Sequence, residues 1–111
     1  GALYDHLCAT ARALHGAIAG RADFEALHEP ESNILCFRYR GDGSIDAERL
    51  DRLNLRLREE YNRSGAGWIT TTLLVGRRVL RVTIMNPRTG AGDVERTLNR
   101  LAEMAGRLKA P

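Results

Sequence analysis

Apolar and β-branched residues fill two runs on either side of Gly76, within residues 68–87. This pattern is typical of a β-hairpin, and glycine followed by Arg77 suits a type II′ turn, which would place Thr72 opposite Arg81. Side chains alternate between the two faces of a sheet. One predicted face is a core face and carries Ile69, Thr71, Leu73, Val75, Leu80, Val82 and Ile84. The other is mixed and carries Trp68, Thr70, Thr72, Leu74, Val79, Arg81, Thr83 and Met85. We expect another domain or a second copy to cover this mixed face, because both faces are largely uncharged.

Three other segments have apolar residues at the spacing of an amphipathic helix. The first spans residues 1–20 and ends at Gly20, the second runs from a cap at Ser44 to about Arg63, and the third follows a cap at Thr89. The residues expected to be buried are Leu3, Leu7, Ala11, Leu14 and Ile18 in the first helix, Leu50, Leu53, Leu57 and Tyr61 in the second, and Val94, Leu98, Leu101, Ala105 and Leu108 in the third.

Two further strands are expected over residues 24–28 and 34–40, separated by a turn that contains Pro30. In the second of these strands Cys36 and Arg38 share the face opposite to Leu35 and Phe37. The order is helix, two strands, helix, two strands, helix. It predicts an α+β fold with an antiparallel four-stranded sheet and helices on one face. Residues 1–111 are expected to form a single domain.

The chain is basic, with a net charge of +3 at pH 7 and 17 basic residues, of which all but Lys109 are arginine. The arginines alternate with acidic residues along the helices, as in a solvated, salt-bridged face, and aromatic residues make up 5% of the chain. We therefore expect no nucleic-acid partner. No segment is long enough to cross a membrane and no leader is apparent. Cys8 and Cys36 are expected to be buried thiols, which fits a cytoplasmic protein.

The search for catalytic or metal-binding motifs is mostly negative. There is no glycine-rich phosphate loop and no Cys/His cluster with metal spacing. His28 beside Glu29 could form an acid–base pair, although a histidine at a turn edge is the favoured interpretation. Asn54 and Asn99 are taken as surface or packing residues. We expect no self-contained catalysis in this chain.

Two segments resemble a known protein family. They are Asn-Ile-Leu-Cys-Phe-Arg at residues 33–38 and Leu-Arg-Val-Thr-Ile-Met-Asn-Pro at residues 80–87. Both are similar to motifs in the C-terminal small domain of the group II pyridoxal-phosphate-dependent amino-acid decarboxylases, which act on glutamate, aromatic amino acids or 2,4-diaminobutyrate. The similarity covers nearly the whole chain and is nearest in character to the diaminobutyrate-type bacterial members. It implies the small domain of a fold-type I enzyme.

The resemblance implies that the chain is part of a longer enzyme. A separate large domain would bind pyridoxal phosphate through a lysine, and Lys109 is not expected to be that lysine. The implied partners are the large domain, a second copy in a homodimer and an amino-acid substrate. Arg81 is implied to bind the substrate carboxylate, with Thr72 as a candidate neighbour, and Arg38 to hold the small domain to the large one. Arg77 and Arg78, at the tip of the hairpin, are expected to face solvent.

Two alternatives stay open from the sequence. The chain could be a free-standing binding or dimerisation module with no catalytic activity, whose open sheet face packs on a partner. Likewise, Arg81 could form a salt bridge with a neighbouring element instead of contacting a substrate.

Overall fold

The computed structural model describes residues 1–27, 30, 32–65, 69–74, 76–84, 88 and 90–109. The elements are α1 (Ala2–Ala19), β1 (Phe24–Ala26), β2 (Ile34–Tyr39), α2 (Ala47–Ser64), β3 (Thr70–Leu74), β4 (Arg77–Thr83) and α3 (Ala91–Lys109). The predicted element order and the α+β class are confirmed. The predictions made for Trp68, Val75, Met85, the Thr89 cap and the pair of His28 with Glu29 fall outside the described residues.

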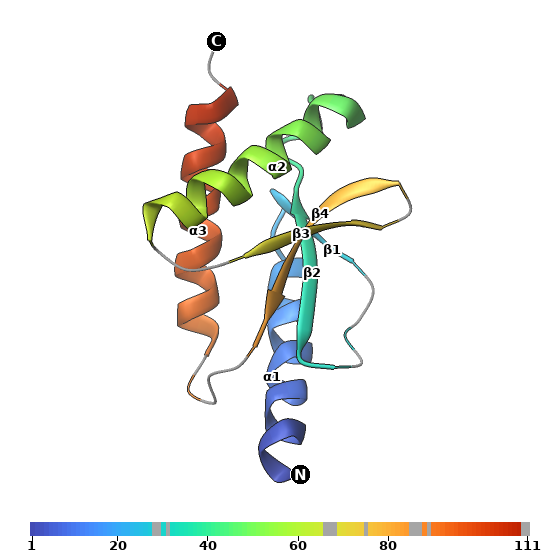
Figure 1. Ribbon diagram of the computed structural model, residues 1–111, viewed down its shortest axis with the longest axis vertical. Helices are drawn as coiled ribbons and strands as arrows, with labels where there is room; N and C mark the ends of the chain where they lie inside the picture. Colours follow the sequence, from blue (N-terminus) through green and yellow to red (C-terminus); the bar gives the residue numbers. More distant parts are fainter. Residues whose placement is uncertain are drawn as a thin grey trace.

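The sheet is antiparallel throughout, with the strand order β1-β2-β4-β3. In Figure 1, α1 and α3 run along the long axis of the molecule and α2 crosses α3. Phe24, Phe37 and Leu80 from the core face of the sheet share one buried cluster with residues of all three helices. Phe24 packs edge-on against Tyr39, with ring centroids 5.4 Å apart. The helices therefore cover one face of the sheet. The opposite face, called the open face below, is exposed at Arg81 and Thr83, whereas Arg38 and Val79 on the same face are buried.

The hairpin turn differs from the prediction by two residues in register. Leu74 lies opposite Arg77, and Thr70, not Thr72, lies opposite Arg81. Gly76 has φ +77°, so it takes the left-handed conformation as the second residue of the two-residue connection, where the type II′ prediction had glycine first. Because the side-chain period of a strand is two, this shift keeps each residue on its predicted face and changes only the cross-strand partners. Two burial predictions differ: Leu73 of the predicted core face is 56% exposed, and Val79 of the mixed face is buried.

The helix ends and buried stripes differ from the prediction in a few positions. The carboxylate of Asp46, not Ser44, caps α2 by accepting a hydrogen bond from the Arg49 backbone N–H at 2.9 Å. Leu3 was expected to be buried but is 59% exposed, because the first turn of α1 extends past the sheet. Leu50, Val94 and Leu108 are half-buried, whereas the other predicted positions of the three stripes are buried. Met104 joins the buried residues of α3. Cys8 is buried as predicted, whereas Cys36 is only half-buried.

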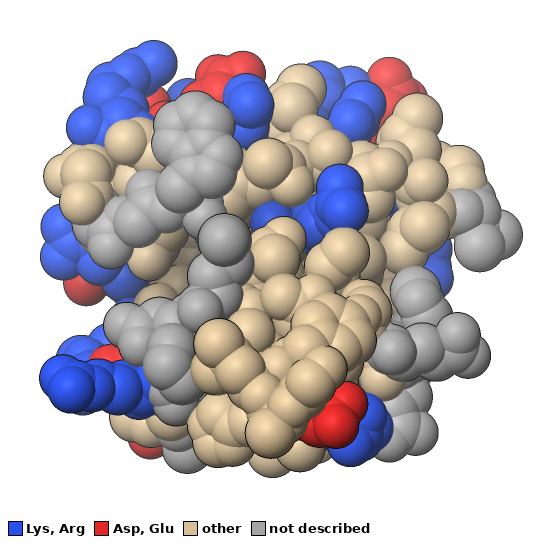
Figure 2. Space-filling model, turned by 60° about the horizontal axis from the view of Figure 1, so that its bottom comes forward, with Lys and Arg blue, Asp and Glu red and all other residues tan. Residues whose placement is uncertain are grey.

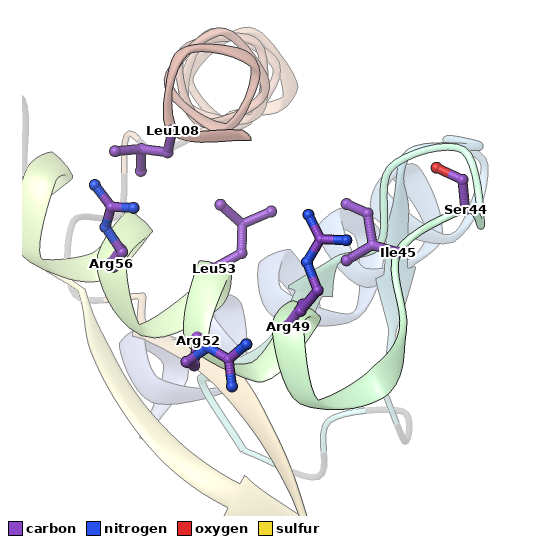
Figure 3. Close-up of a pocket in the computed structure, with 7 residues that line it drawn as sticks. All are labelled: Ser44, Ile45, Arg49, Arg52, Leu53, Arg56 and Leu108. Atoms are coloured by element: carbon purple, nitrogen blue, oxygen red, sulfur yellow. The ribbon is translucent and has the colours of Figure 1, made fainter. Parts of the chain in front are cut away.

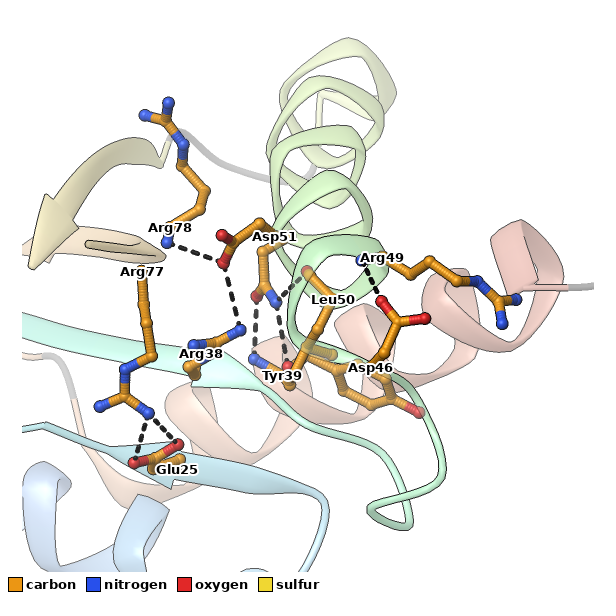
Figure 4. A network of polar contacts seen from close by, with 10 residues as sticks. Glu25, Arg38, Tyr39, Asp46, Arg49, Leu50, Asp51, Arg77 and Arg78 are labelled. Carbon is orange, nitrogen blue, oxygen red and sulfur yellow. Dashed lines mark hydrogen bonds and ion pairs between the residues drawn. The ribbon is translucent and has the colours of Figure 1, made fainter. Parts of the chain in front are cut away.

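Strands β2 and β4 separate at the end of the sheet nearest α2. The last residue pair between them is Phe37 with Leu80. Beyond it, Asn54 of α2 accepts a hydrogen bond from the backbone N–H of Tyr39 at 2.9 Å and donates to its carbonyl oxygen at 3.0 Å. Asp51 of the same helix accepts from the backbone N–H of Arg78 at 2.9 Å (Figure 4). Side chains of α2 thus replace the strand partner that each strand has lost.

A second asparagine repeats this arrangement near the other end of α2. The side chain of Asn62 donates to the Ile69 carbonyl oxygen and accepts from the Ile69 backbone N–H, both at 2.8 Å. Gly65, in the left-handed conformation with φ +77°, then ends the helix. The helix is therefore joined by hydrogen bonds to residues of both hairpins.

We predict that Asn54→Ala destabilises the domain strongly. Asn54 is fully buried, and its removal leaves the buried N–H and C=O of Tyr39 without their side-chain partner. The expected loss in the free energy of unfolding is about 3 kcal/mol, measured by urea denaturation of the 111-residue chain. Asn99→Ala is the control, because Asn99 is exposed and accepts from Arg21, and it should change stability by less than about 0.5 kcal/mol. Equal effects of the two substitutions would contradict the prediction.

Candidate functional site on the open face of the sheet

Arg81 lies in the middle of β4, on the open face of the sheet. In the strand register it is flanked by Cys36 of β2 on one side and Thr70 of β3 on the other. The Thr70 hydroxyl donates to the carbonyl oxygen of Arg81 at 3.3 Å. Thr72 lies opposite Val79, so the predicted neighbour is diagonal to Arg81 instead of directly across from it. The direct threonine neighbour is therefore Thr70.

The guanidinium of Arg81 is exposed, and within the described part of the chain it has no hydrogen bond or ion pair. Its strand neighbours Cys36 and Thr70 are uncharged. A carboxylate on the same face, that of Glu25 in β1, is paired with Arg77 at 3.3 Å. Arg81 is consequently a cation that is available to an anionic group approaching the open face.

The pKa of the Cys36 thiol is affected both by the burial of the side chain and by the charge of Arg81. The side chain is half-buried, and this burial raises the pKa of the Cys36 thiol because a thiolate is poorly solvated there. The positive charge of Arg81 opposes this effect and lowers the pKa. Cys8 and Cys36 are both free thiols, so the prediction that they do not form a bridge is confirmed.

Arg38 is the most deeply buried charged residue among those described, with 2% of its surface exposed. Its Nη2 atom pairs with Asp51 Oδ1 at 3.3 Å (Figure 4), and its buried Nε has no hydrogen-bond partner among the described residues. Burial lowers the pKa of Arg38, the charge of Asp51 raises it, and that of Arg77 lowers it. This ion pair lies inside the domain. The contact of Arg38 with a large domain stays a prediction.

The prediction for the hairpin tip was wrong. Arg77 and Arg78 are half-buried instead of facing solvent. Arg77 pairs with Glu25 across the sheet, and Arg78 Nη1 donates to the Thr71 hydroxyl at 3.2 Å. The true register brings the two arginines onto the strand itself, where cross-strand partners are available.

The described residues contain no group of three or more His, Cys, Asp or Glu side chains that could hold a metal ion. None of the helices in the described part of the chain has the length and apolarity needed to span a bilayer.

Comparisons with known proteins bear on this fold. No protein-family model matches the sequence, and the curated proteins give no significant match. One similar solved structure is the glutamate decarboxylase domain of diaminobutyrate-pyruvate transaminase and L-2,4-diaminobutyrate decarboxylase from Vibrio parahaemolyticus. It is 32% identical to this chain and superimposes with a TM-score of 0.87. The match covers 96% of this chain and 22% of that chain. Mouse CSAD in its apo form has 28% identity and a TM-score of 0.78, covering 95% and 24% of the two chains. Oryza sativa TDC with PLP and tryptamine is 22% identical, with a TM-score of 0.80, and the match covers 96% of this chain and 23% of that chain. At this low identity the comparison supports a shared fold only.

The chain resembles a domain of the group II pyridoxal-phosphate-dependent decarboxylases. The resemblance predicted from the two sequence motifs is therefore confirmed. The chain spans between a fifth and a quarter of the length of these decarboxylase structures, at 22–24%. In a decarboxylase of this kind it corresponds to one domain of a larger chain.

We predict that Arg81→Gln slows the alkylation of Cys36. Removing the positive charge of Arg81 takes away the influence that lowers the Cys36 pKa, so the pKa rises and less thiolate is present at a given pH. The measurement is the rate of Cys36 labelling by iodoacetamide as a function of pH, in a Cys8→Ala background. Arg100→Gln, on the exposed surface of α3, is the control and should leave the pH profile unchanged. An unchanged profile in Arg81→Gln would show that the two side chains are not electrostatically coupled.

We also predict opposite outcomes for the two members of the Arg38–Asp51 pair. Arg38→Met replaces a buried cation by an apolar chain of similar length and should change the free energy of unfolding by less than about 1 kcal/mol. Asp51→Ala leaves the buried Arg38 cation without its ion-pair partner and the Arg78 N–H without its acceptor. The expected loss in the free energy of unfolding is about 2 kcal/mol. This is less than for a fully buried pair, because the Asp51 side chain is 34% exposed and solvent screens its charge. Urea denaturation of the two variants measures both values, and a larger loss in Arg38→Met would contradict the prediction.

Proposed function

We propose that this chain is the C-terminal small domain of a pyridoxal-phosphate-dependent L-amino-acid decarboxylase, where it completes the active site and contributes to a homodimer. One observation carries the proposal. Arg81, on a fold similar to that of decarboxylase structures, presents an exposed guanidinium without a partner in the described part of the chain, on an open sheet face beside uncharged neighbours.

The chemistry of a guanidinium suits this role. Its planar fork of N–H donors matches the two oxygens of a carboxylate, so it can fix the orientation of an amino-acid carboxylate as well as bind it. The cofactor of such enzymes supplies the electron sink for the reaction, and this chain supplies the contact to the carboxylate. Strand β4 is paired on both sides, with β2 and β3, which fixes the backbone from which Arg81 extends.

The open face of this chain does not fit pyridoxal phosphate by itself. Among the residues described, the sheet strands carry no lysine that could form a Schiff base, and the Glu25 carboxylate is held by Arg77. The lysine of the sequence, Lys109, is the last residue of α3. The proposal therefore assigns the cofactor to a large domain of the same enzyme, located in the cytoplasm, and leaves this chain the role of closing the site.

Uncharged surface supports the proposed contacts with the large domain or a second copy. Leu3 and Tyr4 of α1 are 59% and 50% exposed. They lie at the start of the helix, at the end of the molecule that Figure 2 brings forward, where much of the surface is uncharged. Large apolar side chains such as these can be buried against another protein surface.

We predict that Arg81→Gln in the full-length enzyme lowers kcat/KM for the amino acid by about 100-fold, the loss expected when a charge-assisted, bidentate contact to a carboxylate is removed. The enzyme should fold normally, because Arg81 is exposed and makes no ion pair in the described structure. The decisive comparison uses the product amine, which lacks the carboxylate. Arg81→Gln should leave inhibition by the amine nearly unchanged, whereas the affinity for the amino acid falls.

Arg81→Lys and Arg77→Gln are the matched variants. Lysine keeps the charge without the planar fork and should restore part of the activity, whereas Arg77 is engaged with Glu25 and its replacement should have a small effect on kcat/KM. Near-normal kinetics of Arg81→Gln would refute the carboxylate role. A native mass near 12.3 kDa for the protein in its source would favour the free-standing module instead of the decarboxylase domain.

A further inference from the structure

A groove between the start of α2 and the end of α3 is lined by both basic and apolar side chains. Its volume is about 510 Å³, within the range of about 300–1,000 Å³ that is usual for ligand sites. Ile45, Leu53 and Leu108 supply its apolar lining, and Arg49, Arg52 and Arg56 supply its basic lining. Figure 3 shows Arg49 and Arg56 on either side of Leu53, extending toward the side on which Leu108 lies.

These two arginines have no ion pair within the described part of the chain. Glu48 pairs with Arg52 at 3.0 Å, and Asp46 accepts the backbone N–H of Arg49 as the cap of α2. Arginine is the charged residue type among the lining residues that the structure describes, and none of these residues is acidic. The groove therefore presents positive charge beside apolar side chains, a combination that fits a ligand with both anionic and apolar groups.

The spacing of the arginines indicates which class of ligand the groove can bind. Arg49 and Arg56 are seven positions apart on one helix, which corresponds to about 10 Å along its axis. An extended or helical ligand with two anionic groups about 10 Å apart matches this spacing. None of the lining residues that the structure describes is aromatic, so the groove offers no platform on which nucleic-acid bases could stack.

We propose that this groove binds an acidic amphipathic helix of a partner protein. Two carboxylates two helical turns apart on that helix contact Arg49 and Arg56, and an apolar side chain between them packs on Leu53 and Leu108. The groove lies between two helices, away from the open sheet face that carries Arg81, so a helix bound there leaves the proposed carboxylate contact of Arg81 accessible.

The test measures the binding of a synthetic, fluorescently labelled helical peptide to the intact protein by fluorescence anisotropy. The peptide carries two glutamates two turns apart with a leucine between them on the same face. We expect saturable binding that weakens as salt is raised. Arg49→Gln combined with Arg56→Gln should weaken it by at least about tenfold.

Matched controls separate a specific site from general attraction to a basic protein. Arg96→Gln combined with Arg100→Gln removes the same charge from the exposed surface of α3 outside the groove and should leave the affinity within about twofold of the original. A peptide with glutamines in place of the glutamates, and one with the glutamates on opposite faces, should bind at least about tenfold more weakly. Equal losses in the two double variants, no preference among the peptides, or tighter binding of a single-stranded oligonucleotide through the same arginines would each overturn the proposal.

Discussion

The structure depends on polar side chains of α2 that complete the backbone hydrogen bonding of the sheet. Asn54 bonds both backbone groups of Tyr39, Asn62 does the same for Ile69, and Asp51 accepts the N–H of Arg78. A buried backbone group without a partner is costly, so β2 and β4 can separate at this end only because α2 supplies these partners. An apolar stripe alone would bury α2 against the sheet. The amide and carboxylate groups set where along the strands it lies.

The same arrangement positions the open face. Arg78 and Arg81 belong to one strand, which α2 holds at the Arg78 amide and which β2 and β3 hold on either side of Arg81. A side chain that must meet a small anion benefits from a backbone that is fixed in advance. The internal Arg38–Asp51 pair therefore serves the proposed site indirectly, because it shares the carboxylate that holds β4.

Much of the fold could be predicted from the sequence because it follows from local periodicity. The alternation around Gly76 and the helical spacing of the leucines identified the elements and placed Arg81 on the sheet face opposite to the core. The partner of Arg81 could not be predicted in the same way. A turn at residues 75–76 and one at 76–77 both use Gly76, and they differ in whether Thr70 or Thr72 lies opposite Arg81. Only the packed sheet decides between these registers.

The role of Asn54 was missed for a related reason. A signal for it exists, because Asn54 lies four residues after Leu50 and three before Leu57, within the buried stripe of α2. A polar residue in such a stripe must find hydrogen-bond partners. The sequence does not show which backbone groups provide them. Arg38 and Arg77 pose the same problem, since their burial and their partners arise from residues that are distant in the chain.

The use of side chains as strand partners has a consequence for the dynamics of the domain. The amide hydrogens of Tyr39, Ile69 and Arg78 are bonded to α2, whereas those within the paired strands are bonded to other strands. Protection of these amides against solvent exchange is therefore tied to the docking of the helix, and protection of the paired strands to the opening of the sheet. Motion of α2 and motion of the sheet can in this way be distinguished residue by residue in one molecule.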